Sequence, residues 1–119
     1  MGVLVAPMSY VPERGDLVWL EFSPHAGHEQ AGRRPAAVLS PKPYNSKVGL
    51  FLACPVSTQV KGYPFEVAIP QGFPIAGVIL ADQIKSLDWR GRKASYICSL
   101  AAPVLDELLA KASTLISPQ

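Results

Sequence analysis

Short apolar runs, each bounded by proline or glycine, are the feature that most constrains the fold of this chain. The five runs comprise residues 15–22, 35–40, 48–56, 65–69 and 77–81, and they are rich in Val, Leu, Ile and Phe, which is typical of β-strands. Residues 93–99 are expected to add one more strand. Twelve prolines and nine glycines are too many for a helical bundle, but they suit a barrel whose strands end in sharp turns. The sequence therefore predicts a mainly β fold of the barrel type.

The last segment of the chain changes to a helical period. Its apolar positions are Leu105, Leu108, Leu109, Ala112, Leu115 and Ile116. Residues three and four positions apart share one face of a helix, so the segment predicts an amphipathic C-terminal helix that buries these side chains. Pro103 suits the first helical turn, and Glu107 can pair with Lys111 one turn further on. The apolar stripe has to be covered by the barrel or by a second subunit.

Length and composition favour one compact domain. The chain has 119 residues, of which 49% are hydrophobic, and this is enough apolar material for a single core. We therefore expect one domain over residues 1–119, in which residues 1–9 are a loose N-terminal extension. The net charge is only +2, which excludes a general polyelectrolyte for DNA. Any contact with nucleic acid has to come from locally clustered Arg and Lys side chains.

The cysteines and histidines indicate a cytoplasmic protein without a metal. Cys54 and Cys98 each lie within an apolar stretch, as expected for reduced cysteines of a core. The apolar run near the N-terminus is too short to span a membrane and lacks the basic start of a signal peptide. His25 and His28 have no cysteine and no carboxylate cluster beside them, so they make a poor metal site. We expect no metal and no cofactor.

The longest polar connection between the expected strands, residues 23–34, is the first candidate for a functional site. It contains Glu29, Arg33 and Arg34. Long loops on small rigid barrels tend to carry function. Arginine suits phosphate, and a carboxylate can accept a proton or orient an arginine, which is the chemistry that RNA cleavage without a cofactor requires. Two adjacent arginines before a strand are equally compatible with a solvated loop edge.

A second polar cluster follows the apolar run that ends at Val56. Its members are Ser57, Thr58, Gln59, Lys61 and Tyr63. Hydroxyls at a strand end can donate to a phosphate, and an exposed tyrosine can stack on an unpaired base. The alternative is a hydrogen-bonded turn, which Ser and Thr form routinely.

A third cluster combines Asp82, Gln83 and Lys85 with the basic stretch 89–93, which begins with Trp89. Cations that follow a backbone and a ring that stacks on a base suit a groove for single strands. Trp89 is equally compatible with a position in the core, surrounded by ordinary surface charges.

Four ordered blocks of sequence carry a resemblance to a known family. They are residues 10–41 (YVPERGDLVWLEFSPHAGHEQAGRRPAAVLSP), 44–49 (YNSKVG), 58–67 (TQVKGYPFEV) and 80–92 (LADQIKSLDWRGR). Together these blocks resemble the MazF branch of the MazF/PemK ribonuclease toxins. The region after Arg92 is similar only in having one more strand and a terminal helix.

The resemblance implies an SH3-like barrel of the MazF/PemK/CcdB type with a C-terminal helix, and a homodimer. It further implies the toxin of a type II toxin–antitoxin system that cuts single-stranded RNA at a short recognition sequence and so arrests translation and growth. The implied products are a 2′,3′-cyclic phosphate and a 5′-hydroxyl, formed without a metal. The implied partner is an antitoxin whose acidic, disordered tail obstructs the RNA site.

Three catalytic positions transfer from the family pattern. The catalytic arginine, in its Gln-Ala-Gly-x-Arg-Pro context, falls on Arg34, and an acidic residue of the site falls on Glu29. The catalytic hydroxyl falls on Ser57, where the family usually has threonine. Serine keeps the hydroxyl but lacks the methyl group that restricts its rotamer, so Thr58 can share or take over the role.

The remaining candidates are expected to bind RNA. They are Arg33, Asn45, Thr58, Gln59, Lys61, Tyr63, Gln83 and Lys85. In the PemK branch an arginine two residues before the aspartate assists cleavage, but here that position is Leu80. The PemK-style mechanism therefore does not transfer, and Asp82 keeps an orienting or turn-capping role.

Residue chemistry limits what the arginine can do. A guanidinium stays protonated at neutral pH, so our hypothesis gives Arg34 the task of stabilising the pentacovalent phosphate, with a second hydrogen bond from Ser57. The proton acceptor is then Glu29, His28 or a water molecule.

Two other functions fit the same kind of barrel. One is a toxin that poisons a protein such as DNA gyrase through its C-terminal helix without cutting anything. The other is an RNA-binding module without catalytic activity. Cleavage of a long single-stranded RNA in the presence of EDTA separates the ribonuclease from both alternatives.

Overall fold

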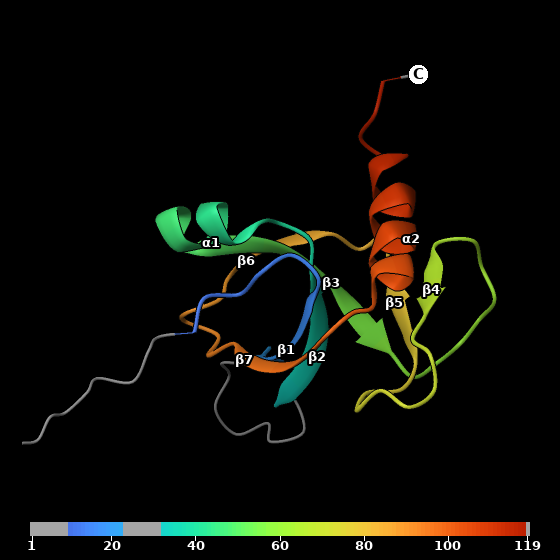
Figure 1. Ribbon diagram of the computed structural model, residues 1–119, viewed down its shortest axis with the longest axis horizontal. Coiled ribbons are helices and arrows are strands. Elements are labelled where there is room, and N and C mark those ends of the chain that lie inside the picture. Colours follow the sequence, from blue (N-terminus) through green and yellow to red (C-terminus); the bar gives the residue numbers. More distant parts are fainter. Residues whose placement is uncertain (1–9, 23–31, 119) are drawn as a thin grey trace, which may run out of the picture.

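The structure, a computed structural model, describes residues 10–22 and 32–118 and is built mainly from antiparallel strands (Figure 1). The strands are β1 (Asp16–Glu21), β2 (Arg33–Val38), β3 (Leu50–Ser57), β4 (Glu66–Ala68), β5 (Val78–Leu80), β6 (Lys85–Asp88) and β7 (Ser95–Ser99). The helices are α1 (Lys42–Val48) and α2 (Ala102–Ser113). The prediction of a mainly β fold with a C-terminal helix is confirmed.

Strand β3 is the centre of the sheet. The strands follow the order β4-β5-β3-β2-β1-β7, and β6 pairs with β3 as well. Residues 50–53 of β3 pair with β6, whereas Val56 and Ser57 pair with β5. The segment from β5 to β6 therefore runs along one edge of β3, and residues 81–84 loop out between the two pairings. The other edge of β3 pairs with β2.

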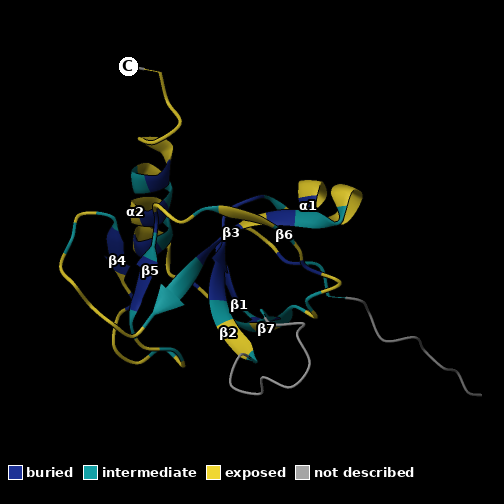
Figure 2. Cartoon of the chain, turned by 180° about the vertical axis from the view of Figure 1, so that it is seen from behind, coloured by how far each residue is buried: buried dark blue, intermediate teal, exposed yellow. Residues whose placement is uncertain are grey.

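Two apolar clusters form the core, and the alternation of β1 separates them. Leu17 belongs to a cluster that α2 covers with Val104, Leu108 and Ala112. Its neighbour Val18 belongs to a second cluster on the other face. Because successive side chains of a strand point to opposite faces, the two clusters lie on opposite faces of β1; Figure 2 shows the buried residues of the fold in dark blue.

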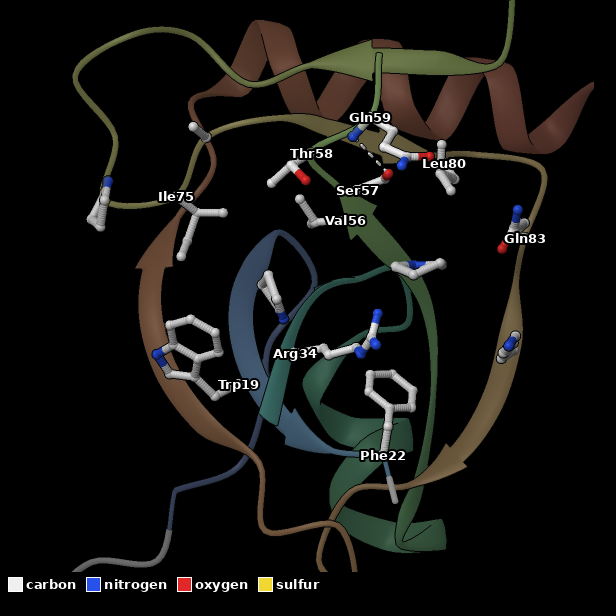
Figure 3. A pocket seen from close by; sticks show the side chains of 15 residues that line it. Trp19, Phe22, Arg34, Val56, Ser57, Thr58, Gln59, Ile75, Leu80 and Gln83 are labelled. Carbon is white, nitrogen blue, oxygen red and sulfur yellow. Dashed lines mark hydrogen bonds between the residues drawn. The ribbon is translucent and has the colours of Figure 1, made fainter. Parts of the chain in front are cut away.

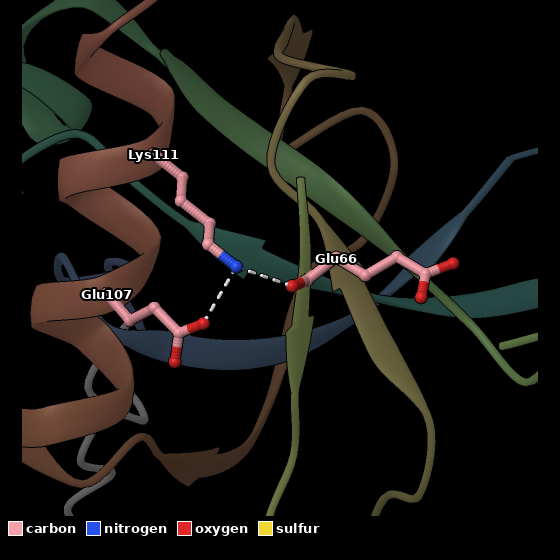
Figure 4. Close-up of polar contacts among 3 residues, drawn as sticks. All are labelled: Glu66, Glu107 and Lys111. Atoms are coloured by element: carbon pink, nitrogen blue, oxygen red, sulfur yellow. Dashed lines mark hydrogen bonds and ion pairs between the residues drawn. The ribbon is translucent and has the colours of Figure 1, made fainter. Parts of the chain in front are cut away.

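Helix α2 is docked by polar as well as apolar contacts. Lys111 Nζ lies 2.9 Å from Glu107 Oε2 and donates a hydrogen bond of 2.9 Å to the carbonyl oxygen of Glu66 in β4 (Figure 4). The predicted Glu107–Lys111 pair is thus confirmed, and Pro103 lies in the first turn as expected. The lysine stem bridges the helix to the edge of the sheet.

The apolar stripe of the helix is shorter than the sequence indicated. The helix ends at Ser113, and Leu115 and Ile116 follow in a turn with 48% and 76% of their surface exposed. Leu109 is half-buried, whereas Leu108 is fully buried. Leu109 packs against the first cluster, whereas the strands of this chain leave Leu115 and Ile116 exposed. That a second subunit covers these two side chains stays a prediction.

Helix α1 and strand β6 were missing from the sequence prediction. Prolines 41 and 43 made the segment of α1 resemble a turn, although proline is tolerated in the first turn of a helix. The helix ends at Gly49, whose φ of 83° is the left-handed conformation that favours glycine. Strand β6 has the sequence KSLD, which carries little β-strand signal, and it forms because β3 presents an unpaired edge.

Asn45 has a structural role that corrects its assignment to RNA binding. Its side chain is 0% exposed. The amide Nδ2 donates to the carbonyl oxygens of Pro12 and Ser40, and Oδ1 accepts a hydrogen bond from Ser40 Oγ. With every polar atom engaged inside the protein, Asn45 joins α1 to the neighbouring segments and cannot contact RNA.

The structure also shows where Trp89 and the two cysteines lie. Trp89 belongs to the second apolar cluster and donates through Nε1 to the carbonyl oxygen of Asn45 at 3.0 Å, so the core alternative is the right one. Both cysteines are free; Cys54 is buried, as expected, but Cys98 is only half-buried. Burial raises the pKa of the Cys54 thiol to about 12.

The helices in the described part of the chain are all too short or too polar to cross a membrane.

Candidate active site

A groove of about 990 Å³ opens where β2 and β3 separate (Figure 3). Its walls come from β1, β2, the end of β3, the loop between β4 and β5, and the start of β6. Of the sequence candidates, the groove brings together Arg34, Ser57, Thr58, Gln59, Gln83 and Lys85. Segments that are distant in the sequence thus contribute to one site.

Strand register explains why Arg34 and Ser57 face each other. The last paired residues of β2 and β3 are Ala36 and Pro55. Arg34 lies two residues before Ala36, and Ser57 lies two residues after Pro55, so all four side chains belong to the same face of the strand pair. Beyond the last pair the strands diverge, and both polar side chains project into the gap (Figure 3). The end of the ladder therefore makes the site.

A second cation comes from the opposite edge of β3. Lys85 pairs with Ala53, which is four residues before Ser57 and thus on the same face of the strand. Gln83 lies in the segment that loops out between β5 and β6. Arg34 and Lys85 are both exposed, so the site presents two positive charges on either side of β3. We call Arg34, Ser57, Gln83 and Lys85 the polar half of the groove.

The hydroxyl of Ser57 is oriented by its own turn. Ser57 Oγ accepts a hydrogen bond of 3.0 Å from the backbone N–H of Gln59. Because this bond uses a lone pair of the oxygen, the hydroxyl hydrogen stays available to donate to an anionic group. Thr58 also lines the groove and is exposed. The geometry thus presents Ser57 as a prepared donor, with a second hydroxyl beside it.

Gly77 fixes the backbone of Ser57 from the other side. It precedes β5 and has a φ of 125°, a conformation that side chains rarely allow. A Cβ atom at this position would collide with the carbonyl oxygen of Ser57. Glycine therefore lets the start of β5 approach the catalytic candidate more closely than any other residue would.

The other part of the groove is apolar, and it was not predicted from the sequence. Trp19 pairs with Pro35 across β1 and β2, on the face opposite to Arg34. Pro74, Ile75 and Ala76, from the loop between β4 and β5, complete this wall. We call these five residues the apolar half of the groove. A tryptophan at an alternating position near the end of a strand was the signal available, but nothing in the sequence showed which loop would lie over it.

Two guanidinium groups lie against aromatic rings at the margin of the groove. The Arg33 guanidinium carbon lies 5.7 Å from the centroid of the Trp19 ring, and Arg33 Nη2 donates to Ser95 Oγ. The Arg92 guanidinium carbon lies 5.7 Å from the centroid of Phe22, which lines the groove beside Arg34. Arg33 itself does not line the groove. Its guanidinium contacts the Trp19 ring and does not join Arg34 in the groove.

Lys61 and Tyr63 also lie outside the groove. The backbone N–H groups of Lys61 and Gly62 donate to the buried carboxylate of Glu66 at 2.8 and 2.9 Å. Tyr63 donates through its hydroxyl to Asp82 Oδ1 at 2.9 Å, and this hydrogen bond raises the pKa of Tyr63. Asp82 thus joins the segment around Tyr63 to the segment between β5 and β6.

Glu29, His25 and His28 lie outside the described residues. The residues that flank residues 23–31 are described, and the backbone N–H of Phe22 donates to the carbonyl oxygen of Gly32 at 3.3 Å. In the part of the chain with described coordinates, no three His, Cys, Asp or Glu side chains come together as a candidate metal site.

Comparison with known proteins identifies relatives of the whole fold. The family model of the PemK-like, MazF-like toxins of type II toxin–antitoxin systems matches residues 13–116. The endoribonuclease toxin MazF of Escherichia coli is 51% identical over 107 residues, which are 90% of this chain and 96% of the relative. The endoribonuclease toxin ChpB of the same species is 33% identical and covers 87% of this chain and 93% of its own length.

Solved structures agree with these relatives. The crystal structure of MazF from Deinococcus radiodurans matches with a TM-score of 0.81 at 54% identity, covering 91% of this chain and 98% of that one. A MazE–MazF crystal structure from the same organism matches with a TM-score of 0.83 at 47% identity, covering 93% of this chain and 100% of that one. The similarity extends over nearly the full length of the described fold.

Proposed function

Because this chain belongs to the family of PemK-like, MazF-like toxins of type II toxin–antitoxin systems, we propose that its groove cuts single-stranded RNA. The chain is accordingly an endoribonuclease toxin whose action arrests translation and growth in the cytoplasm. The observation that supports the site is the placement of Arg34 and Ser57 on one face, at the point where β2 and β3 separate. We treat residues 1–119 as one functional domain.

The cleavage step uses a nucleophile that RNA itself supplies. The ribose 2′-oxygen attacks the adjacent phosphorus, its proton passes to a base, and the bond from phosphorus to the 5′-oxygen breaks. The departing 5′-oxygen takes up a proton, so the products are a 2′,3′-cyclic phosphate and a 5′-hydroxyl. Negative charge on the phosphoryl oxygens peaks midway, and this charge is what the protein has to stabilise. The step balances without a metal or a cofactor.

The polar half supplies that stabilisation. Arg34 can present two parallel N–H donors to the phosphoryl oxygens, and Ser57 adds a hydroxyl donor. Lys85 contributes a positive charge across β3, which attracts the RNA backbone. The proton acceptor is Glu29, His28 or water, and Glu29→Gln with His28→Ala tests the two side chains. If both variants cleave normally, water accepts the proton.

We also propose the partners. The MazE–MazF crystal structure contains a toxin with MazE, and we infer that a MazE-like antitoxin with an acidic, disordered tail binds this chain over the groove. The two exposed cations, Arg34 and Lys85, suit such a tail. We further infer that the toxin acts as a homodimer. The 5′ ends of the cleavage products identify the short RNA sequence that it recognises.

Cleavage of a long single-stranded RNA by the purified protein in the presence of EDTA tests the proposal. We expect discrete cuts whose downstream fragments begin with a 5′-hydroxyl. Arg34→Ala should abolish the cuts, and Lys47→Ala is the control because it removes an exposed positive charge from α1, outside the groove. Intact RNA with a mobility shift would show that the protein is an RNA-binding module without catalytic activity. If the RNA is neither cut nor shifted in mobility, the result favours a toxin of the gyrase type.

A further inference from the structure

We propose that the apolar half of the groove is a nucleobase subsite, in which Trp19 stacks on an unpaired base next to the phosphate that is cut. This inference rests on the proposed ribonuclease function, and it assigns a role to a surface that the cleavage step does not use. The ligand is one base of the single-stranded RNA substrate.

Continuity with the polar half is the first argument. Arg34 and Pro35 are neighbours in β2, so their side chains point to opposite faces of the same strand. The groove extends over the strand end and joins both faces. A phosphate held by Arg34 and Ser57 therefore lies in the same groove as the apolar wall.

The chemistry of the wall suits a flat, uncharged group. Trp19 provides a large ring and is half-buried, whereas Pro35, Ile75 and Ala76 provide only aliphatic surface. A base presents two apolar faces, and aromatic stacking on a base is tolerant of its identity. Phosphate and ribose are too polar for such a wall, because burying them would leave their oxygens without hydrogen bonds. A base is thus the part of the nucleotide that fits.

Arg33 prepares the tryptophan for this task. Its guanidinium lies over the Trp19 ring and is tied to Ser95 in β7 through a hydrogen bond. A cation over one side of an aromatic ring is attracted by the ring's electrons and restricts the ring's motion. A ring that is already fixed loses little entropy when a base stacks against it. Arg33 is therefore a positioning residue for Trp19, which gives the second arginine of the loop a role away from the phosphate.

The two halves then read the RNA differently. The side chains of the apolar half have one polar hydrogen between them, the indole N–H of Trp19, so this subsite detects the presence of a base more than its identity. The polar half contains Gln83, and Gln59 lies beside it on the groove wall. Amide side chains can pair with the edge of a base. Sequence selection is therefore expected from the amides and not from Trp19.

Abasic substrates test the subsite directly. An RNA oligonucleotide that spans a mapped cut is prepared in versions that lack one base at a time, and each is cleaved by the wild type and by Trp19→Ala. For the wild type we expect one abasic position beside the cut to raise KM on the order of 5- to 150-fold, the range for one base stack. Trp19→Ala should raise KM for the intact RNA to a similar extent and be insensitive to that abasic position.

Three further variants separate stacking from a structural role. Trp19→Phe keeps a ring and should restore most of the KM, while Arg33→Ala should show a smaller defect that disappears in the Trp19→Ala background. Tyr44→Ala removes an aromatic residue with 40% exposure on α1, away from the groove, and should leave KM unchanged. Thermal unfolding of each variant checks that the fold is intact.

The outcomes discriminate between the two proposals. In one outcome the wild type cuts RNA while Trp19→Ala has an unchanged KM; this outcome overturns the subsite and leaves the ribonuclease in place. The same holds if the KM defect of Trp19→Ala and the KM defect of an abasic substrate multiply at every abasic position. If Trp19→Ala weakens only the binding of an antitoxin peptide, the apolar half is a protein contact and the subsite is again overturned. If the wild type does not cut RNA at all, both proposals fail together.

Discussion

The two halves of the groove meet at strand β2 but have opposite chemistry. The polar half offers charge and hydrogen bonds from Arg34, Ser57 and Lys85, whereas the apolar half offers ring and aliphatic surface around Trp19. Adjacent residues of β2, Arg34 and Pro35, supply one side chain to each half because a strand alternates its faces. The difference shows how a strand end can place a charged site and an apolar site in one groove.

This division predicts two kinds of kinetic defect. Charge on the phosphoryl oxygens develops only in the transition state, so losses in the polar half should lower kcat. Stacking of a base is the same before and during the reaction, so losses in the apolar half should raise KM. A variant of one half that produced the defect of the other half would break the comparison.

The largest effect is expected from Arg34→Lys. Lysine keeps the charge but lacks the planar fork that presents two parallel donors. We expect kcat to fall about 10²- to 10³-fold, the typical loss when a donor to a developing oxyanion is removed. Single-turnover cleavage at saturating enzyme measures it. Nearly full cleavage by this variant would show that a single positive charge is sufficient.

Ser57→Ala should follow in size. Loss of one hydrogen bond to a charged group costs about 1.5–3 kcal/mol, which corresponds to a drop in kcat of about 10- to 150-fold. Thr58→Ala is the matched control, since it removes the neighbouring hydroxyl, and Ser57→Thr should restore activity. A stronger defect in Thr58→Ala than in Ser57→Ala would transfer the catalytic role to Thr58.

Gly77→Ala is designed to disturb both halves at once. A Cβ here meets the backbone of Ser57, and Gly77 also ends the loop that carries Ile75. We expect kcat to fall and KM to rise together, with a loss of stability of about 1–3 kcal/mol because φ is positive. Urea unfolding and steady-state cleavage measure the two effects. A change in KM alone would show that β5 can shift without moving Ser57.

The smallest effect is expected from Lys85→Gln, which separates charge from stacking. Removing one phosphate contact should weaken RNA binding only a few-fold and reduce the slope of log Kd against log salt concentration by about 0.7. Trp19→Ala should leave that slope unchanged, because stacking releases no counterions. Fluorescence anisotropy with the 2′-deoxy form of the oligonucleotide, which cannot be cut, gives both slopes. Equal slopes in Lys85→Gln and wild type would remove Lys85 from the RNA path.

Much of the polar half could be predicted from the sequence. Arg34 and Ser57 carry recognisable motifs, and both lie close to strand ends that the apolar runs locate to within two residues. Lys85 was identified only as a member of a polar cluster. Its position beside β3 depends on a strand, β6, whose own sequence gives little signal.

The rest depends on contacts that no local pattern contains. Asn45 lies in a polar stretch typical of a surface loop, yet it is buried because three polar partners surround it. Trp19 was read only as part of an apolar strand, and its exposure to the groove results from the way the loop 70–76 folds back. Arg33 and Arg34 are adjacent and chemically identical, and only the strand alternation separates their roles.

One backbone hydrogen bond makes the apolar wall of the groove open to redesign. The N–H of Ile69 donates to the carbonyl oxygen of Gly77 at 3.0 Å and closes the hairpin loop 70–76 at its base. Pro74, Ile75 and Ala76 thus belong to an insert whose two ends are fixed independently of its contents. Loops of other lengths and sequences can be grafted between these anchors, and the same catalytic frame can then be supplied with different recognition surfaces.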